Sequence, residues 1–168
     1  MRRVAVLGSG GSGKTWLAQR IGVRLELPVH HLDSLSFAAD WSAIPAPEFE
    51  RRQRDLVDGD RWVIEGNHVP TAPIRLRAAD TVVYLDRSTA ACLWGLAKRQ
   101  LEGRGSTRVR VPPVTPRYAW HVASFRRRRR PDMLRLFATQ RTGRLVVLRT
   151  AREIRAFLAS LGQPVGRR

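Results

Sequence analysis

The sequence is poor in several residue types, and each shortage excludes a kind of protein. Cys92 is the single cysteine among 168 residues, so the chain forms no internal disulfide and no cysteine-based metal site. No apolar run approaches the roughly 20 residues that a membrane-spanning helix needs. The apolar stretch after the two N-terminal arginines covers only Val4 to Leu7 before glycines follow, which is too short for a secretory signal. We therefore expect a cytoplasmic protein without a membrane segment.

Acidic side chains are scarce as well, and the shortage lies in one half of the chain. The sequence has 31 Lys and Arg against 14 Asp and Glu, for a net charge of +17. Residues 1 to 84 hold 11 basic and 10 acidic side chains, whereas residues 85 to 168 hold 20 basic and 4 acidic ones. This asymmetry indicates an anionic partner for the second half.

Five consecutive arginines, Arg126 to Arg130, form the densest part of that charge. Successive helical residues are about 100° apart, so two or three of the five at most reach one phosphate. Three interpretations stay open for this run: a solvated basic face, a contact with nucleic acid, and direct action on a bound nucleotide. Nearby Tyr118 and Trp120 are candidates for base stacking or for burial.

The hydrophobic pattern predicts an α/β fold in one domain, residues 1–168. Five short apolar runs alternate with segments of helical periodicity, which is typical of a parallel sheet with helices on both faces. Residues 34–46 and 102–117 are expected to be irregular, and the helix at 88–101 is expected to bury Leu93, Leu96, Ala97 and Leu101. The predicted strands are 3–7, 28–32, 62–64, 81–85 and 145–148. The other predicted helices follow residue 15, span 46–57, lie near 118–125 and 131–137, and begin at a Thr150–Glu153 capping box.

One motif carries a specific chemical prediction. The run GSGGSGKT matches the phosphate-loop pattern G-x-x-x-x-G-K-[ST] at every fixed position, directly after an apolar strand and before a helix. Glycines let successive backbone N–H groups point at phosphate oxygens, and the N-terminus of the helix adds partial positive charge. Lys14 is expected to reach the β- and γ-phosphates of ATP, and the Thr15 hydroxyl to bind Mg²⁺. The predicted phosphate-binding residues are Gly8, Ser9, Gly10, Gly11, Ser12, Gly13, Lys14 and Thr15.

Carboxylates follow three of the predicted strands, at the sheet edge where ligands bind in folds of this type. Glu65 is favoured as the carboxylate on the magnesium side because a glycine follows it, with Asp86 as the alternative. Each is otherwise a cap or a partner of a nearby arginine. Asp33 is a candidate for accepting the proton of an attacking hydroxyl, or else an N-cap. His30 and His31 precede it, and strand alternation argues against a metal pair.

The segments GSGGSGKTWLAQRI, HLDSLSF, WVIEGNH, AADTVVYLDRS and LAKR, in this order, resemble the bacterial DNA-topology-modulation-protein-like family. The resemblance runs from residue 3 to about residue 160. That family belongs to the adenylate kinase-like branch of P-loop kinases, beside shikimate and gluconate kinases. The resemblance implies phosphoryl transfer and a five-stranded sheet in the order 2-3-1-4-5, although the family name implies an effect on DNA topology.

The same resemblance implies places for further residues. Glu65 falls where adenylate kinases carry an aspartate, and Arg99 lies on the helix where an arginine packs on adenine. Roughly residues 102 to 130 correspond to an arginine-rich lid over the nucleotide. The lid arginines that would clamp phosphates are Arg104, Arg108 and Arg110, of which we assign Arg104 and Arg108 a catalytic role.

The acceptor side departs from these relatives. Adenylate kinases follow the third strand with Gly-Phe-Pro-Arg, whose arginine binds a monophosphate, but Gly66, Asn67 and His68 stand here and the next arginine is Arg75. Shikimate kinases place two aspartates one residue apart after the second strand, and only Asp33 is present. The Asn-Lys-x-Asp motif for guanine is absent. Asn67 and His68 are therefore candidates for presenting neutral groups to an uncharged acceptor.

Two function hypotheses of different classes follow. The first is ATP- and Mg²⁺-dependent phosphoryl transfer to a small hydroxyl-bearing acceptor, with Lys14, Asp33, Arg104 and Arg108 as catalytic residues. The second is a nucleotide-gated protein that binds nucleic acid non-specifically through its arginine-rich half and turns over little ATP. A slow ATPase, in which water replaces the acceptor, is a third possibility.

Overall fold

The computed structural model describes residues 1–38, 42–101 and 114–162. Five parallel strands form one sheet in the order β2-β3-β1-β4-β5, which confirms the predicted strand order and the α/β class. In the register, Ala5 of β1 is aligned with Ile64 of β3 and Val82 of β4. The strands are β1 (Arg3–Gly8), β2 (Val29–His31), β3 (Trp62–Glu65), β4 (Thr81–Leu85) and β5 (Arg144–Leu148).

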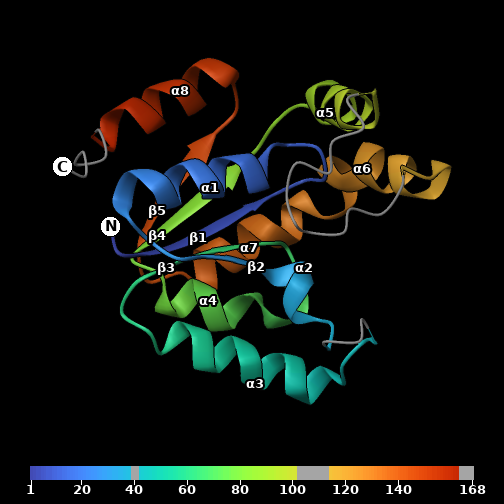
Figure 1. The fold of residues 1–168 in the computed structure, drawn as a ribbon. Helices are drawn as coiled ribbons and strands as arrows, with labels where there is room; N and C mark the ends of the chain where they lie inside the picture. Colours follow the sequence, from blue (N-terminus) through green and yellow to red (C-terminus); the bar gives the residue numbers. More distant parts are fainter. Residues whose placement is uncertain (39–41, 102–113, 163–168) are drawn as a thin grey trace.

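Helices cover both faces of this sheet (Figure 1). Helices α1 (Lys14–Leu25) and α8 (Ala151–Ser160) pack on one face, and α3 (Ala46–Val57), α4 (Ala72–Ala78) and α7 (Arg130–Gln140) on the other. Helices α5 (Thr89–Leu101) and α6 (Pro116–Arg128) pack against each other beside the phosphate loop. Two short helices are α2 (Leu32–Leu35), after β2, and the 3₁₀ helix η1 (Val69–Thr71), before α4.

The alternation of side chains along β1 separates the two main parts of the core. Val4 and Val6 pack with α1 and α8, while Ala5 and Leu7 pack with the helices of the opposite face. All four are fully buried. A central strand of a parallel sheet is covered on both sides, which is why this run is continuously apolar.

The predicted inward face of α5 is partly wrong. Leu96 is buried as expected and Leu93 is half-buried, but Ala97 and Leu101 are exposed, Leu101 by 82%. Cys92 is buried instead. The reason is that α5 packs on α6 and the phosphate loop rather than on the sheet, so the face it buries is rotated from the one that hydrophobicity indicates.

The segments after β2 and β3 hold helices that the sequence pattern did not predict. Asp33 lies inside α2 instead of ending a strand, and Phe37 pairs with Ala43 in an isolated bridge within the segment expected to be irregular. Helix α4 is seven residues long, begins at Ala72 and has Pro73 in its first turn. It was missed because Arg75 and Arg77 interrupt its short apolar pattern.

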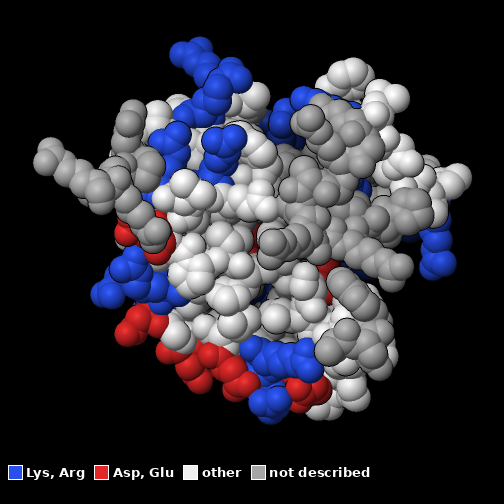
Figure 2. Space-filling model, in the orientation of Figure 1, with Lys and Arg blue, Asp and Glu red and all other residues white. Residues whose placement is uncertain are grey.

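Acidic side chains gather along the edge formed by α3 in Figure 2, with basic ones among them, and further basic side chains lie on the upper part of the same face. On α3, Arg51 pairs with Glu48 and Asp55, and Arg54 with Glu50. These exposed pairs stabilise little individually. Over the described ranges, no helix is both long enough and apolar enough to cross a membrane.

Candidate functional site

The phosphate loop joins β1 to α1 through a backbone that glycines allow. Gly11 has φ 71° and Gly13 has φ 94°, in the left-handed region that favours glycine. Gly13 is the N-cap residue of α1 and offers no side-chain cap, so the first N–H groups of the helix are left for a ligand. The Lys14 ammonium folds back over the loop and donates to the Ser9 carbonyl at 3.1 Å. This geometry fits an anion cradle.

Two loop hydroxyls have the character of ligand-binding groups. The Ser12 hydroxyl is buried and has no hydrogen-bond partner in the described part of the chain, and the buried Ser9 hydroxyl has only the Cys92 thiol beside it. A buried hydroxyl without a partner costs roughly 1–3 kcal/mol. A phosphate group in the loop would supply acceptors for hydroxyls placed in this way.

Helices α5 and α6 lie directly against the loop. A Cβ on Gly11 would collide with the Cys92 carbonyl, and a Cβ on Gly95 with the Gly11 carbonyl. On the other side, a Cβ on Gly10 would meet the Tyr118 hydroxyl and Val122 of α6. Because these positions are glycine, the two helices can pack directly against the backbone of the phosphate loop. Gly95, in the middle of α5, was the sequence signal for this close packing.

Asn67 holds the loop from the β3 side. Its amide oxygen accepts from the Gly8 N–H at 3.0 Å, and its amide nitrogen donates to the Gly8 carbonyl at 2.6 Å. Both ends of this side chain are therefore used on the loop backbone, which corrects the expectation that Asn67 presents its amide to an acceptor. His68 contacts Thr71 through Nδ1 at 2.9 Å and packs edge-on against Phe49.

Glu65 lies beside the residue predicted to share a metal with it. The Thr15 hydroxyl donates to Glu65 Oε1 at 3.1 Å. His31 Nδ1 lies 2.9 Å from the same oxygen and donates to it, since an ionised carboxylate only accepts. Burial acts to raise the pKa of Glu65, but the His31 hydrogen bond, the Lys14 charge and the Thr15 hydroxyl together hold it below its ordinary value. Glu65 is thus a buried, ionised carboxylate.

The donor set fits Mg²⁺ held jointly by protein and phosphate. A hydroxyl and a carboxylate are the hard oxygen ligands that Mg²⁺ prefers, and this ion usually takes its other ligands from water and phosphates. Both hydrogen bonds to Glu65 go to Oε1, so Oε2 has no protein partner among the described residues. The described part of the chain contains no group of three His, Cys, Asp or Glu that would hold a metal alone.

Asp33 lies in the first turn of α2 and is exposed, and its negative charge acts on other groups of the same site. It is not the N-cap of that helix, because His31 occupies the position, so the alternative role proposed from the sequence is wrong. Its charge acts on both Arg75 and His68.

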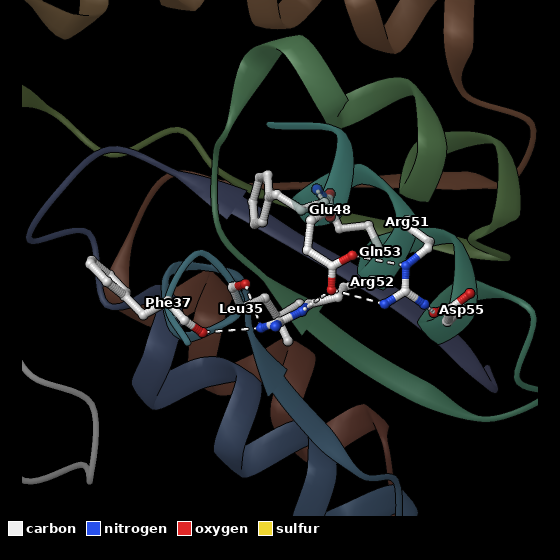
Figure 3. Close-up of polar contacts among 8 residues, drawn as sticks. Leu35, Phe37, Glu48, Arg51, Arg52, Gln53 and Asp55 are labelled. Carbon is white, nitrogen blue, oxygen red and sulfur yellow. Dashed lines mark hydrogen bonds and ion pairs between the residues drawn. The ribbon is translucent and has the colours of Figure 1, made fainter. Parts of the chain in front are cut away.

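Helix α3 is attached to the segment after α2 by Arg52, which donates to the Phe37 carbonyl at 3.0 Å and pairs with Glu48 (Figure 3).

Arg75, which sequence reasoning passed over, is the buried cation of the acceptor side. It is 1% exposed and donates to Gln53 of α3 at 3.3 Å and to the Gly66 carbonyl at 3.1 Å. Within the described residues it forms no ion pair. Burial lowers the pKa of Arg75 to about 10, against the opposing charges of Asp33 and Glu65. Arg75 therefore links α3 to the loop after β3, and its positive charge offsets the negative charges of Asp33 and Glu65.

Asp86, the alternative metal-side carboxylate, is paired with arginines. Arg130 donates to it through two nitrogens at 2.8 and 2.9 Å, and Arg149 lies 3.5 Å away. Burial acts to raise the pKa of Asp86, but Arg130, Arg126 and Arg149 lower it below its ordinary value. The arginine-partner role considered for Asp86 is the one observed.

The arginine run is divided between different environments. Arg130 serves Asp86, while Arg126 to Arg129 are exposed. Burial raises the pKa of the Cys92 thiol, and the charges of Arg87, Lys14 and Arg126 act to lower it. Cys92 lies against Gly11 of the phosphate loop, so the charges of these three residues act close to that loop. The arginines Arg104, Arg108 and Arg110 lie outside the described residues, and Arg99 is on α5 as expected.

Comparison with solved structures finds the same architecture in several kinases. Shikimate kinase from Acinetobacter baumannii, in complex with shikimate, matches with a TM-score of 0.62 and 16% identity over 96% of this chain and 90% of its own. Shikimate kinase from Bacteroides thetaiotaomicron gives 0.59 and 15% over 95% of both chains. An unliganded sugar kinase from Janibacter sp. HTCC2649 gives 0.54 and 14% over 96% of this chain and 90% of that one.

These likenesses define the class of the fold: a P-loop NTPase domain of the kind found in shikimate kinase. At such identities they show the architecture alone. No protein-family model matches the sequence, and no curated protein matches it either.

Proposed function

We propose that this protein is a kinase that transfers the γ-phosphoryl group of ATP, with Mg²⁺, to a small hydroxyl-bearing acceptor. The observation that carries the proposal is the Thr15–Glu65 contact beside a glycine-built loop closed by Lys14. This arrangement brings an anion cradle and hard oxygen ligands to one edge of the sheet. Shikimate and sugar kinases with the same architecture support phosphoryl transfer as the reaction class.

Each residue has a role that follows from its surroundings. Lys14 and the N-terminus of α1 stabilise negative charge on the transferring group, which is where most catalysis of a loose transition state comes from. Thr15 and Glu65 hold Mg²⁺, which neutralises phosphate charge when bound. Asp33 orients the acceptor hydroxyl and receives its proton as the new P–O bond forms and ADP leaves. Arg87 and Arg126 join the predicted lid residues Arg104 and Arg108 as candidates for contacting phosphates.

The acceptor would bind on the side of the site that is formed by α2, α3 and the segment after β3. Asp33 and His68 border it, and the buried Arg75 balances the carboxylate charge there. Within kinases of this fold, we assign the chain to the neighbourhood of the DNA-topology-modulation-protein-like family, on the motifs quoted above. The alternative of a nucleotide-gated nucleic-acid-binding protein has no support in these comparisons.

The test is ATP turnover by the purified protein with Mg²⁺, alone and against nucleosides, nucleotides, sugars and hydroxy acids. The expected result is that one class of compound accelerates ADP release many-fold and gains a phosphate. ATP binding without acceleration by any compound would contradict the kinase assignment and favour the nucleotide-gated nucleic-acid-binding alternative.

A further inference from the structure

A large aromatic side chain stands exposed next to the phosphate loop. Trp16 follows Thr15 directly, lies in the first turn of α1 and is 49% exposed. An exposed tryptophan costs free energy that burial against a partner would recover. None of the roles assigned above uses it.

The helical spacing of α1 sets the direction of this side chain. Trp16, Arg20 and Arg24 are four residues apart and so form one stripe, while Leu17 and Ile21 on the neighbouring stripe are fully buried in the core. Arg24 donates to the Gly162 carbonyl, just past α8, at 3.1 Å. The stripe therefore runs along the flank of α1 that faces α8.

Trp16 lies at the end of this stripe that is next to the phosphate loop. Because β1 and β5 are parallel, the turns into α1 and into α8 leave the sheet at the same edge, and the two helices run side by side (Figure 1). Arg24 marks the far end, and Trp16 marks the end beside the loop and the start of α8. Arg149, 62% exposed on its side chain, precedes α8 there.

The indole has one partner already. The Arg20 guanidinium carbon lies 5.4 Å from the ring centroid, a cation–π contact that holds the ring in place. About half of the surface of the residue still faces solvent, which leaves room for a second flat group.

We propose that Trp16 stacks on the base of the nucleotide whose phosphates lie in the Gly8–Thr15 loop. This inference rests on the proposed function, since it requires nucleotide in that loop. Stacking on an aromatic ring contributes about 1–3 kcal/mol per base and accepts any base, because every base has a π face. Trp16 would thus provide affinity for the nucleoside without reading adenine, so ATP and GTP should bind with similar strength.

The experiment compares Trp16→Ala with Trp94→Ala, which removes a 68% exposed tryptophan of α5. Binding of ATP, GTP and inorganic tripolyphosphate is measured by calorimetry. Trp16→Ala is expected to weaken ATP and GTP binding about 5- to 150-fold, the range that stacking converts to, and to leave tripolyphosphate binding unchanged. Trp16→Phe should restore part of the loss. Trp94→Ala should change none of the three.

The outcomes separate this inference from the function it rests on. Equal weakening of ATP and tripolyphosphate by Trp16→Ala would make Trp16 a support of the loop and overturn base stacking. Unchanged ATP binding by the variant would overturn it as well, while the kinase proposal stands. Wild-type protein that binds neither ATP nor tripolyphosphate would overturn both.

Discussion

Two buried carboxylates at the same edge of the sheet have opposite surroundings. Glu65, at the end of β3, is bound by a hydroxyl and an imidazole, whereas Asp86, after β4, is bound by the guanidinium groups of Arg130 and Arg149. Each side chain is nearly inaccessible to water. A carboxylate paired with two arginines has its charge neutralised inside the protein, while Glu65 keeps an oxygen for a cation. The position of a carboxylate at a strand end therefore does not determine its role, which depends on the groups that the carboxylate contacts.

The largest expected effect is on the loop that the two carboxylates flank. Lys14→Ala should lower ATP turnover about 1000-fold or more. The substitution removes the only positively charged side chain of the Gly8–Thr15 loop, which would stabilise the charge of the bound phosphates. Thermal unfolding should change far less than turnover, since the lysine makes one hydrogen bond, to Ser9, and otherwise acts through its charge on Glu65. Lys98→Ala, at the only other lysine, is the matched control. Full turnover in Lys14→Ala would rule out the proposed site.

Glu65→Gln tests the metal-side half of the comparison. The glutamine is the same size and keeps acceptor and donor atoms for Thr15 and His31, but it loses the charge. We expect Mg²⁺ affinity in the turnover assay to fall about 10- to 100-fold with a small change in stability. A Mg²⁺ titration of the reaction rate measures this. An unchanged titration curve would remove Glu65 from the metal.

Asp86→Asn tests the carboxylate that is paired with arginines. We expect the opposite pattern from Glu65→Gln: a loss of stability without a change in Mg²⁺ dependence. Leaving Arg130 and Arg149 without their carboxylate should cost about 1–3 kcal/mol of unfolding free energy, less than for a fully buried pair because both arginines are partly exposed. Urea unfolding measures the loss, and the Mg²⁺ concentration for half-maximal rate should not move. A shift in that concentration equal to the one in Glu65→Gln would erase the distinction between the two carboxylates.

Acid should act on stability through the same ion pair. The folded-state pKa of Asp86 lies below its unfolded value of about 3.9, so the pair contributes fully above that value and loses its contribution as pH falls through the folded pKa. Wild-type unfolding free energy should therefore decline below about pH 4, and Asp86→Asn should decline less. Parallel curves for the two proteins would contradict this account.

The smallest effect is expected at the end of β5, where no charge is at stake. Thr150 caps α8 by accepting from the Glu153 N–H at 3.1 Å, and Glu153 accepts from the Thr150 N–H in return. Thr150→Ala should cost about 1 kcal/mol of stability. It should leave turnover unchanged. Calorimetric melting curves measure the first and the ADP-release assay the second.

Local pattern predicted much of the fold. The Ala46–Val57 helix and the Thr81–Leu85 strand match the expected bounds in full, and the Thr150–Glu153 capping box is present. These elements are long or carry a terminal signal within four residues, so neighbouring side chains determine them. Helix α4 and the buried face of α5 were missed, because short range pattern does not say which surface a helix packs on.

The site shows the same division. The loop from Gly8 to Thr15 was readable in the sequence because eight adjacent residues create it. The Asn67 clamp joins residues 59 positions apart, and the Arg130 pair with Asp86 joins residues 44 apart. No feature of sequence spacing indicates such pairs, and Arg75 likewise reads as one arginine among many until its burial is known.

The sequence alone determined the succession of the five strands and of the longer helices, the phosphate loop and the excess of positive charge in the second half. Only the tertiary structure decided which carboxylate stays available to a cation, which arginine is buried and which tryptophans stay exposed. The physical reason is range: backbone conformation and apolar periodicity are set by near neighbours, whereas the state of a charged or aromatic side chain depends on the solvent it loses and the distant partner it gains.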